Sequence, residues 1–170
     1  MKFLSIKKPI EQEDKEMIKF LSKFELFTNL SSTELHHLAK CIHKREFSQG
    51  EIIFKNGYPN IVFYIIKSGE VKIYIEKENG EEIELNILGE YDFFGEFGLF
   101  LDTSRTASCM AVKETAMYAI SKTEFKSFIN KFPRGGNKIL FSLGKILSQH
   151  IIHLNEKLKH SRLTNEYKEH

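Results

Sequence analysis

Two charged residues near the middle of the chain have the types and the spacing of an anion-binding site. Glu96 lies between Gly95 and Gly98, and Arg105 follows nine residues later at the start of an expected strand. An arginine can give a phosphate two parallel, charge-assisted hydrogen bonds. The two glycines bracket one short helical turn, whose first amides would point outward without partners and would also bind an anion.

Glu96 needs a separate explanation, because a carboxylate only accepts hydrogen bonds and repels an anion. Carboxylates in nucleotide sites accept from a ribose hydroxyl, and Glu96 would have this task here. Backbone amides, one arginine and one carboxylate together indicate a sugar phosphate of low charge. Taken singly, Glu96 and Arg105 would more often form a solvated surface pair and Gly95 a simple turn, so only the combination points to a ligand.

The elements that must position these residues follow from the glycine spacing. The 170-residue chain is 41% hydrophobic and 28% charged, which is the balance of one globular domain. Seven of its ten glycines lie between residues 50 and 98, most of them 7 to 12 residues apart. Turns at this spacing, between short runs rich in Ile, Val, Phe and Tyr, predict an all-β sandwich or barrel.

One hairpin of this domain can be assigned a register. Its two strands carry alternating apolar residues, at Val71, Ile73 and Ile75 and at Ile83, Leu85 and Ile87. Both sets share one face only if paired positions have an even sum, such as 75 with 83. This requires a three-residue loop at 78–80 with Gly80 in a left-handed bulge. Residues 106–112 and 115–120 are predicted to be the closing strands.

The flanking segments, residues 11–40 and 121–160, have apolar residues three and four apart, which predicts helices. The apolar positions in the first flank are Met17, Phe20, Leu21 and Phe24, followed by Leu35, Leu38 and Ala39. Ser31 and Glu34 fit a capping box at the start of the second helix.

The segment after Pro133 predicts one long helix with two apolar faces. The first face is a heptad-like seam of Leu140, Leu143, Leu147, Ile151, Leu154 and Leu158, and the second contains Ile139 and Ile146. Two apolar faces require two partners. We expect the β-domain to cover one face and a second copy of the same helix to cover the other.

The ordered run Phe94-Gly95-Glu96, Gly98, Leu99 and Arg105-Thr106-Ala107 is a specific motif. It resembles the phosphate-binding cassette of cyclic nucleotide-binding domains, the family of the catabolite activator protein and of the regulatory subunits of cyclic-nucleotide-dependent kinases. Upstream, residues 50–54, Gly57 and residues 63–71 follow the strand and turn pattern of the same family. The similarity extends from about residue 24 to residue 155. One departure is Tyr58, where relatives often carry an acidic residue.

The resemblance implies a role for each residue of the cassette. Glu96 would accept from the ribose 2′-hydroxyl, and Arg105 would bind the exocyclic phosphate oxygens. The remaining ligand-binding residues would be Gly95, Phe97, Gly98, Leu99, Thr106 and Ala107, with backbone amides of Phe97 and Gly98 capping the phosphate. The resemblance also implies a residue of the C-terminal helix over the base, and the spacing from Pro133 favours Asn155.

Pattern and resemblance together predict an α+β protein. It contains an eight-stranded antiparallel β-roll, jelly-roll-like, with N-terminal helices and a long C-terminal helix that covers the pocket and dimerises. The expected parts are a helical segment at 1–23, the binding domain at 24–132, and the C-terminal helix and tail at 133–170. The expected function is to bind a cyclic mononucleotide and to signal, through movement of the C-terminal helix, to an unidentified effector protein in trans. We expect cAMP first and cGMP as the alternative, since Thr106 is compatible with both.

Several other classes of protein fit the sequence less well. A cupin-like metal enzyme would carry histidines on its strands, but none lies between His43 and His150, and His150 with His153 lacks a third ligand. Cys41 and Cys109 form no metal or redox motif, and no Ser/His/Asp or Cys/His arrangement indicates a nucleophile. We therefore expect no catalysis, no metal and no cofactor besides the nucleotide ligand.

The expected location is the cytoplasm, without membrane contact. The longest apolar run, residues 61–66, has six residues, against the roughly 20 of a spanning helix. Only ten residues follow His160, too few for a helix-turn-helix, so we expect a stand-alone sensor that does not bind DNA directly. The alternatives are a truncated or divergent transcription regulator of the catabolite activator type, or a degenerate interaction domain that has lost its ligand.

Overall fold

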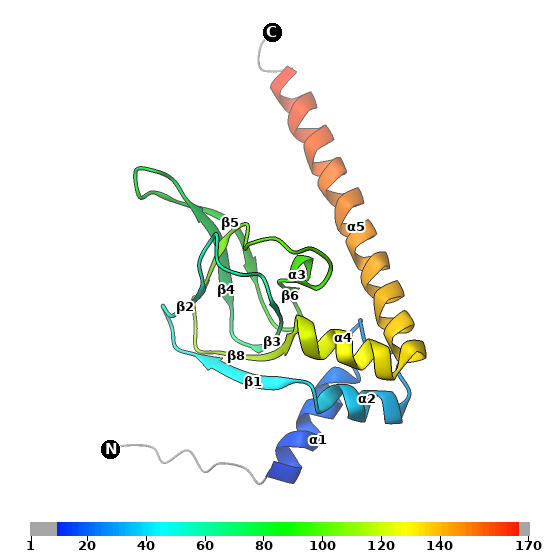
Figure 1. Ribbon diagram of the computed structural model, residues 1–170. Helices are drawn as coiled ribbons and strands as arrows, with labels where there is room; N and C mark the ends of the chain where they lie inside the picture. Colours follow the sequence, from blue (N-terminus) through cyan, green and yellow to red (C-terminus); the bar gives the residue numbers. More distant parts are fainter. Residues whose placement is uncertain (1–9, 167–170) are drawn as a thin grey trace, which may run out of the picture.

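The computed structural model describes residues 10–166 (Figure 1). Its helices are α1 Ile10–Leu21, α2 Ser32–Ala39, α3 Phe97–Phe100, α4 Lys122–Lys131 and α5 Pro133–Glu166. Its strands are β1 His43–Phe47, β2 Ile52–Phe54, β3 Val62–Ser68, β4 Val71–Glu76, β5 Glu82–Leu88, β6 Phe93–Phe94, β7 Ser108–Ala111 and β8 Thr115–Ser121. The predicted segment 1–23 and the predicted tail of 133–170 therefore lie partly outside the described residues, at 1–9 and 167–170.

The eight described strands form two four-stranded sheets, with the orders β1-β8-β3-β6 and β2-β7-β4-β5. Every neighbouring pair is antiparallel. The predicted α+β fold, an eight-stranded antiparallel β-roll with N-terminal helices and a long C-terminal helix, is confirmed.

The hydrophobic residues form two clusters, one on each side of the first sheet. The larger joins α1, α2, α4 and the first half of α5 to β3 and β8, with Leu21, Leu38, Tyr118, Ile139 and Leu143 nearly inaccessible to solvent. The smaller fills the space between the two sheets and contains Ile66, Val71, Phe94, Cys109 and Met117. The helices and the second sheet therefore cover opposite faces of the first sheet.

Capping boxes fix where two of the helices begin. The predicted box at α2 is present: the Ser31 hydroxyl accepts from the Glu34 amide, and the Glu34 carboxylate accepts from the Ser31 amide. Ser121 and Glu124 make the same arrangement at α4. The predicted helical flank after residue 121 is thus two helices, because α4 ends just before Pro133 and α5 begins there, where proline suits a first helical position.

The β4–β5 hairpin confirms part of the predicted register and contradicts the rest. Ile75 pairs with Ile83 around the expected three-residue loop, and Gly80 has a φ of +82°. A bulge between Ile73 and Tyr74 then shifts the pairing by one residue. The shift turns Leu85 and Ile87 to solvent, at 54% and 40% exposure, so the prediction that they share the buried face is wrong.

The two halves of α5 have different surroundings. In the first half Ile139, Leu143 and Ile146 are buried, and Lys138 donates to the Glu34 carboxylate of α2 at 2.9 Å. In the second half Ile151, Leu154 and Leu158 of the predicted seam are each between 57% and 58% exposed. Figure 1 shows this half rising away from the roll. None of the helices within residues 10–166 combines the length and the apolar character that crossing a membrane requires.

Candidate functional site

The turn between β6 and α3 brings the backbone unusually close to two neighbouring segments. Gly95 has a φ of +82°, and a Cβ at this position would lie 2.5 Å from Arg105 Nη1 and 2.6 Å from the Val62 carbonyl oxygen. A Cβ at Gly98 would lie 2.1 Å from the carbonyl oxygen of Asn60. Only glycine fits at either position, so both predicted glycines are needed to place this turn beside Arg105.

Arg105 is held in place by its backbone and by its side chain. Its amide donates to the Tyr58 carbonyl at 2.7 Å, and its own carbonyl accepts from Gly57 at 2.8 Å. The guanidinium Nη2 donates to the Val62 carbonyl at 2.8 Å, and the guanidinium carbon lies 3.9 Å from the ring centre of Phe54. The side chain therefore has one fixed orientation inside the roll.

The buried guanidinium of Arg105 is only partly satisfied. The residue is 5% exposed, and its Nε and Nη1 have no hydrogen-bond partner within residues 10–166. Loss of hydration lowers the pKa of Arg105, although the group stays cationic. A buried charge with unused donors is costly unless a counter-charge binds, so the arrangement is that of an anion site.

Arg105 and Glu96 open into a cavity of about 260 Å³. We call it the arginine cavity. Six of the predicted site residues line it: Gly95, Glu96, Phe97, Arg105, Thr106 and Ala107. Gly98 and Leu99 are buried in α3 just behind this lining. The Gly98 amide donates to the Gly95 carbonyl at 3.3 Å, a long hydrogen bond that leaves the amide weakly engaged.

Glu96 is half-buried at the edge of the arginine cavity. Burial raises its pKa above the ordinary value, while its own backbone hydrogen bond and the charges of His150 and Arg105 act in the opposite direction. Glu96 and Arg105 are not within ion-pair distance of each other in the described structure, so the arginine keeps its donors free for another anion. The carboxylate remains available as an acceptor for a ligand hydroxyl.

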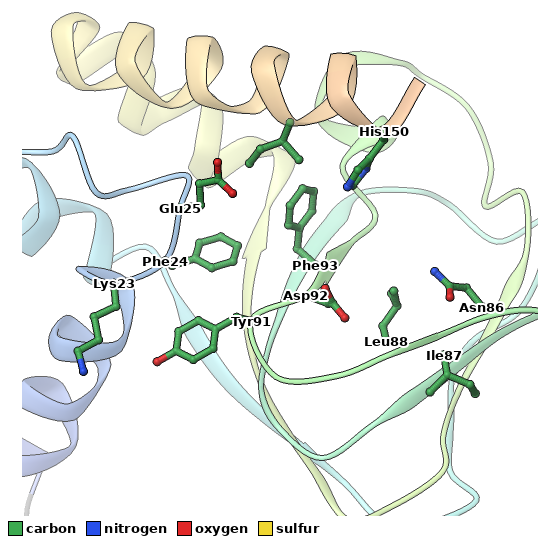
Figure 2. Close-up of a pocket in the computed structure, with 11 residues that line it drawn as sticks. Lys23, Phe24, Glu25, Asn86, Ile87, Leu88, Tyr91, Asp92, Phe93 and His150 are labelled. Carbon is green, nitrogen blue, oxygen red and sulfur yellow. The ribbon is translucent and has the colours of Figure 1, made fainter. Parts of the chain in front are cut away.

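A second cavity of about 510 Å³ adjoins the first on the side of α5. We call it the helix-side cavity. Four residues line both cavities: Asn86, Leu88, Phe93 and His150. Figure 2 shows His150 reaching from α5 toward Phe93, with Asn86 and Leu88 of β5 on the opposite side. The two cavities therefore adjoin each other between the roll and α5, and we call the pair the hollow.

The polar residue of α5 that lines this hollow is not the predicted one. Asn155 is exposed and lies outside the lining of both cavities, so its role over a base stays a prediction without support from its position. His150, five residues earlier, lines both cavities. The sequence does contain a signal for His150. It lies four residues, about one helical turn, after Ile146, so the two residues share one face of the helix.

Two further features of the site carry no clear sequence signal. Asn60 is 6% exposed and lines the arginine cavity, although Pro59-Asn60 reads as an ordinary turn. Phe54 and Tyr64 flank the guanidinium, and burial raises the pKa of the Tyr64 phenol. Aromatic residues on strands usually indicate a core, and only the folded arrangement shows that these two also contact a cation.

Comparison with known proteins agrees with this geometry. The chain is 29% identical over 131 residues to a CRP-like cAMP-activated global transcriptional regulator of Mycobacterium tuberculosis, covering 77% of this chain and 58% of that protein. It is 35% identical over 97 residues to a cGMP-dependent protein kinase of Caenorhabditis briggsae, covering 56% of this chain and 13% of the kinase. The chain thus spans only part of the length of these relatives.

The fold has solved counterparts as well. The Thermus thermophilus catabolite activator protein superposes with a TM-score of 0.68 at 26% identity, covering 79% of this chain and 62% of that one. The family model of the cyclic nucleotide-binding domain matches residues 44–132, just over half of the chain and the part that contains both glycines, Glu96 and Arg105. The chain therefore belongs to the cyclic nucleotide-binding domain family.

Proposed function

We propose that this chain is a sensor that binds a cyclic mononucleotide in the arginine and helix-side cavities. The observation that carries the proposal is the buried Arg105, whose Nε and Nη1 have no partner within the described residues and which lines a cavity with Glu96. A cyclic phosphodiester has one negative charge, which one arginine balances. Its sugar supplies the hydroxyl that a carboxylate can accept from.

The proposed ligand contacts extend over the whole cassette. Arg105 binds the exocyclic phosphate oxygens, and Glu96 accepts from the ribose 2′-hydroxyl. The amides of Phe97 and Gly98 cap the phosphate, with the Thr106 hydroxyl beside it. The base lies toward α5, where His150 supports this placement by lining both cavities, whereas Asn155 does not.

The proposed output is a movement of α5. This helix closes one side of the hollow with Ile146 and His150, so a ligand there contacts it directly. We propose that the movement is passed to a protein partner in trans and that the chain acts as a homodimer through the exposed half of α5. Binding without catalysis fits a site whose charged groups can hold a ligand but include no activated nucleophile.

A calorimetric titration with cAMP and cGMP tests the proposal. We expect cAMP to bind more tightly, and the relatives include both a cAMP-activated regulator and a cGMP-dependent kinase. Tighter binding of cGMP by tenfold, about 1.4 kcal/mol, would reverse the choice of nucleotide and leave the sensor in place. Absence of binding to every cyclic nucleotide would reject the proposal and favour the alternative of a degenerate interaction domain.

A further inference from the structure

Asn60 is a buried polar residue next to the proposed phosphate position. It lies between the Pro59–Ser104 bridge and the start of β3, is 6% exposed, and lines the arginine cavity together with Arg105 and Glu96. The sequence gives no reason for a carboxamide here. Its neighbours in the cavity are the residues that the proposed function assigns to the ligand.

The carboxamide of Asn60 is not satisfied by the protein. Its Oδ1 is enclosed without a donor, and its side chain makes no hydrogen bond to any residue within 10–166. Burying an amide without partners is unfavourable, and buried amides in folded proteins are nearly always paired. The partner that Asn60 lacks is therefore to be sought in what the cavity binds.

The fold does not depend on this carboxamide. Backbone hydrogen bonds already join the segment before Asn60 to Arg105, from Gly57 to Arg105 at 2.8 Å and from Arg105 to Tyr58 at 2.7 Å. Gly98 lies close to the main-chain carbonyl of Asn60, which any residue would supply, and also to its side-chain Oδ1. A smaller apolar side chain at position 60 would keep the backbone hydrogen bonds and the carbonyl contact and would lose only the contact of Oδ1.

Asn60 and Arg105, which line the same cavity, both have unsatisfied polar atoms. Asn60 Oδ1, Arg105 Nε and Arg105 Nη1 are all buried and all without partners in the described chain. A phosphodiester supplies no donor for Oδ1. Rotation of the carboxamide by 180° exchanges its oxygen and nitrogen and places Nδ2, a donor, at the enclosed position of Oδ1, where it can donate to a phosphate oxygen. A neutral donor beside one arginine adds a hydrogen bond to a phosphate but no positive charge. The charge of the arginine therefore still matches the single negative charge of a cyclic phosphodiester.

We infer that Asn60 is a further ligand-binding residue, whose Nδ2 donates a hydrogen bond to the phosphate that Arg105 binds. This inference rests on the proposed function and assigns to its phosphate position a third side-chain contact, after Arg105 and the Thr106 hydroxyl. Asn60 favours a ligand that has an oxyanion at this position. Unlike Glu96, it makes no contact with the sugar hydroxyl.

The test uses three single variants of the full chain, titrated with cAMP, or with cGMP if the wild type prefers it. Asn60→Ala should weaken binding about tenfold, the loss of one hydrogen bond to a charged group. Asn60→Asp places a carboxylate of the same shape against the phosphate and should weaken binding at least about a hundredfold. The control is Asn56→Asp, which adds the same charge at an exposed turn nearby and should stay within about threefold.

Two further measurements separate ligand binding from a structural role. The 2′-deoxy ligand should lose affinity by the same factor in Asn60→Ala as the parent ligand does, because the contact is to phosphate. The melting temperature of unliganded Asn60→Ala should be unchanged or higher, since an unsatisfied amide has been removed. A lower melting temperature, or a loss of affinity that disappears with the 2′-deoxy ligand, would overturn the assignment.

The outcomes also distinguish this inference from the proposed function. If wild type binds, Arg105→Ala does not, and both Asn60 variants bind within twofold of wild type, only the role of Asn60 is rejected. If wild type binds neither cyclic nucleotide, the proposed function and the role of Asn60 are rejected together.

Discussion

Arg105 is a cation that the protein has removed from water before any ligand arrives. Phe54 and Tyr64 lie against its guanidinium, and the Val62 carbonyl takes one of its donors. Inside the roll the local dielectric is low, so an anion that reaches the free donors is bound more strongly than it would be by an exposed arginine. The affinity of the site should therefore depend more on this residue than on any other.

The first prediction compares Arg105→Ala with Glu96→Ala. Removing one member of a buried charge pair costs about 2–5 kcal/mol, so Arg105→Ala should weaken cyclic nucleotide binding by roughly thirtyfold to several thousandfold. Glu96→Ala removes one charged hydrogen bond, on the order of 1.5–3 kcal/mol, but also relieves repulsion of the phosphate, so its effect should be smaller. Calorimetric titration measures both.

Two controls accompany this comparison. Arg45→Ala, at an exposed arginine of β1, should bind like wild type. A 2′-deoxy ligand should bind wild type and Glu96→Ala almost equally. Wild-type affinity in Arg105→Ala would show that the phosphate is not bound where the cassette indicates.

The sequence could reveal the cassette but not every residue of the site. Gly95, Gly98, Glu96 and Arg105 are within eleven residues of one another, so their spacing alone carries a recognisable pattern. Asn60 and His150 reach the same cavity from distant segments, one before β3 and one on α5. Their place depends on how the roll and the helix pack, which no local pattern records.

At the scale of elements, short-range chemistry was predictable and long-range pairing was not. The Ser31–Glu34 capping box and the loop at 78–80 each depend on residues within three positions of one another, and both are confirmed. The bulge in the β4–β5 hairpin leaves Leu85 of β5 without a partner, while β4 keeps a regular register with β7 on its other edge. The hydrophobic alternation of β5 predicted its buried face wrongly, because an alternating pattern assumes a regular register and does not indicate where a bulge interrupts it.

The second prediction concerns the start of α4. His43 Nε2 donates to Glu124 at 2.6 Å and Ser121 Oγ donates to it at 2.7 Å, and these bonds lower the pKa of Glu124 to about 2 from 4.5. The depressed pKa means that the ionised form stabilises the fold above pH 4.5, and that this stabilisation is lost as the pH falls toward 2. Glu124→Gln should reduce the free energy of unfolding at neutral pH by about 1 kcal/mol.

Urea denaturation at several pH values measures this effect. The difference in the free energy of unfolding between wild type and Glu124→Gln should be largest at neutral pH. It should become smaller as the pH falls below 4.5. Glu90→Gln, at an exposed position between β5 and β6, should match wild type throughout. A difference that stays constant down to about pH 3 would contradict the role given to the Glu124 carboxylate.

At the scale of the whole molecule, α5 belongs to the domain along only half its length. Ile139, Leu143 and Ile146 complete the main hydrophobic core. Beyond His150, by contrast, every residue through Lys159 is exposed, including four large apolar ones, Ile151, Ile152, Leu154 and Leu158. A contiguous apolar strip of this kind on a helix is typical of a surface that another protein covers.

The third prediction is that a second copy of the chain covers this strip. Light scattering should report about twice 19.9 kDa for the wild type, and Leu154→Asp should reduce the mass to one copy. Leu154 is suited to the test because it is 57% exposed, whereas Leu147 also packs against the core of its own domain. His153→Asp, at an exposed neighbouring position, should leave the dimer intact. A monomeric wild type at high micromolar concentration would defeat the proposal.

The contact between Lys138 and Glu34 lies near the start of α5, so a movement of this helix about that contact would displace its far end more than the part beside the cavity. If this contact acts as a fulcrum, His150 lies twelve residues beyond it, about 18 Å along the axis, and Glu166 lies about 42 Å beyond it. A rigid helix pivoting there converts a displacement of 1 Å at the cavity into roughly 2.3 Å at its far end. At Leu158, the last residue of the exposed strip and about 30 Å from the fulcrum, the same 1 Å displacement becomes roughly 1.7 Å. A contraction of the hollow too small to disturb the core would thus be larger where it reaches the exposed strip.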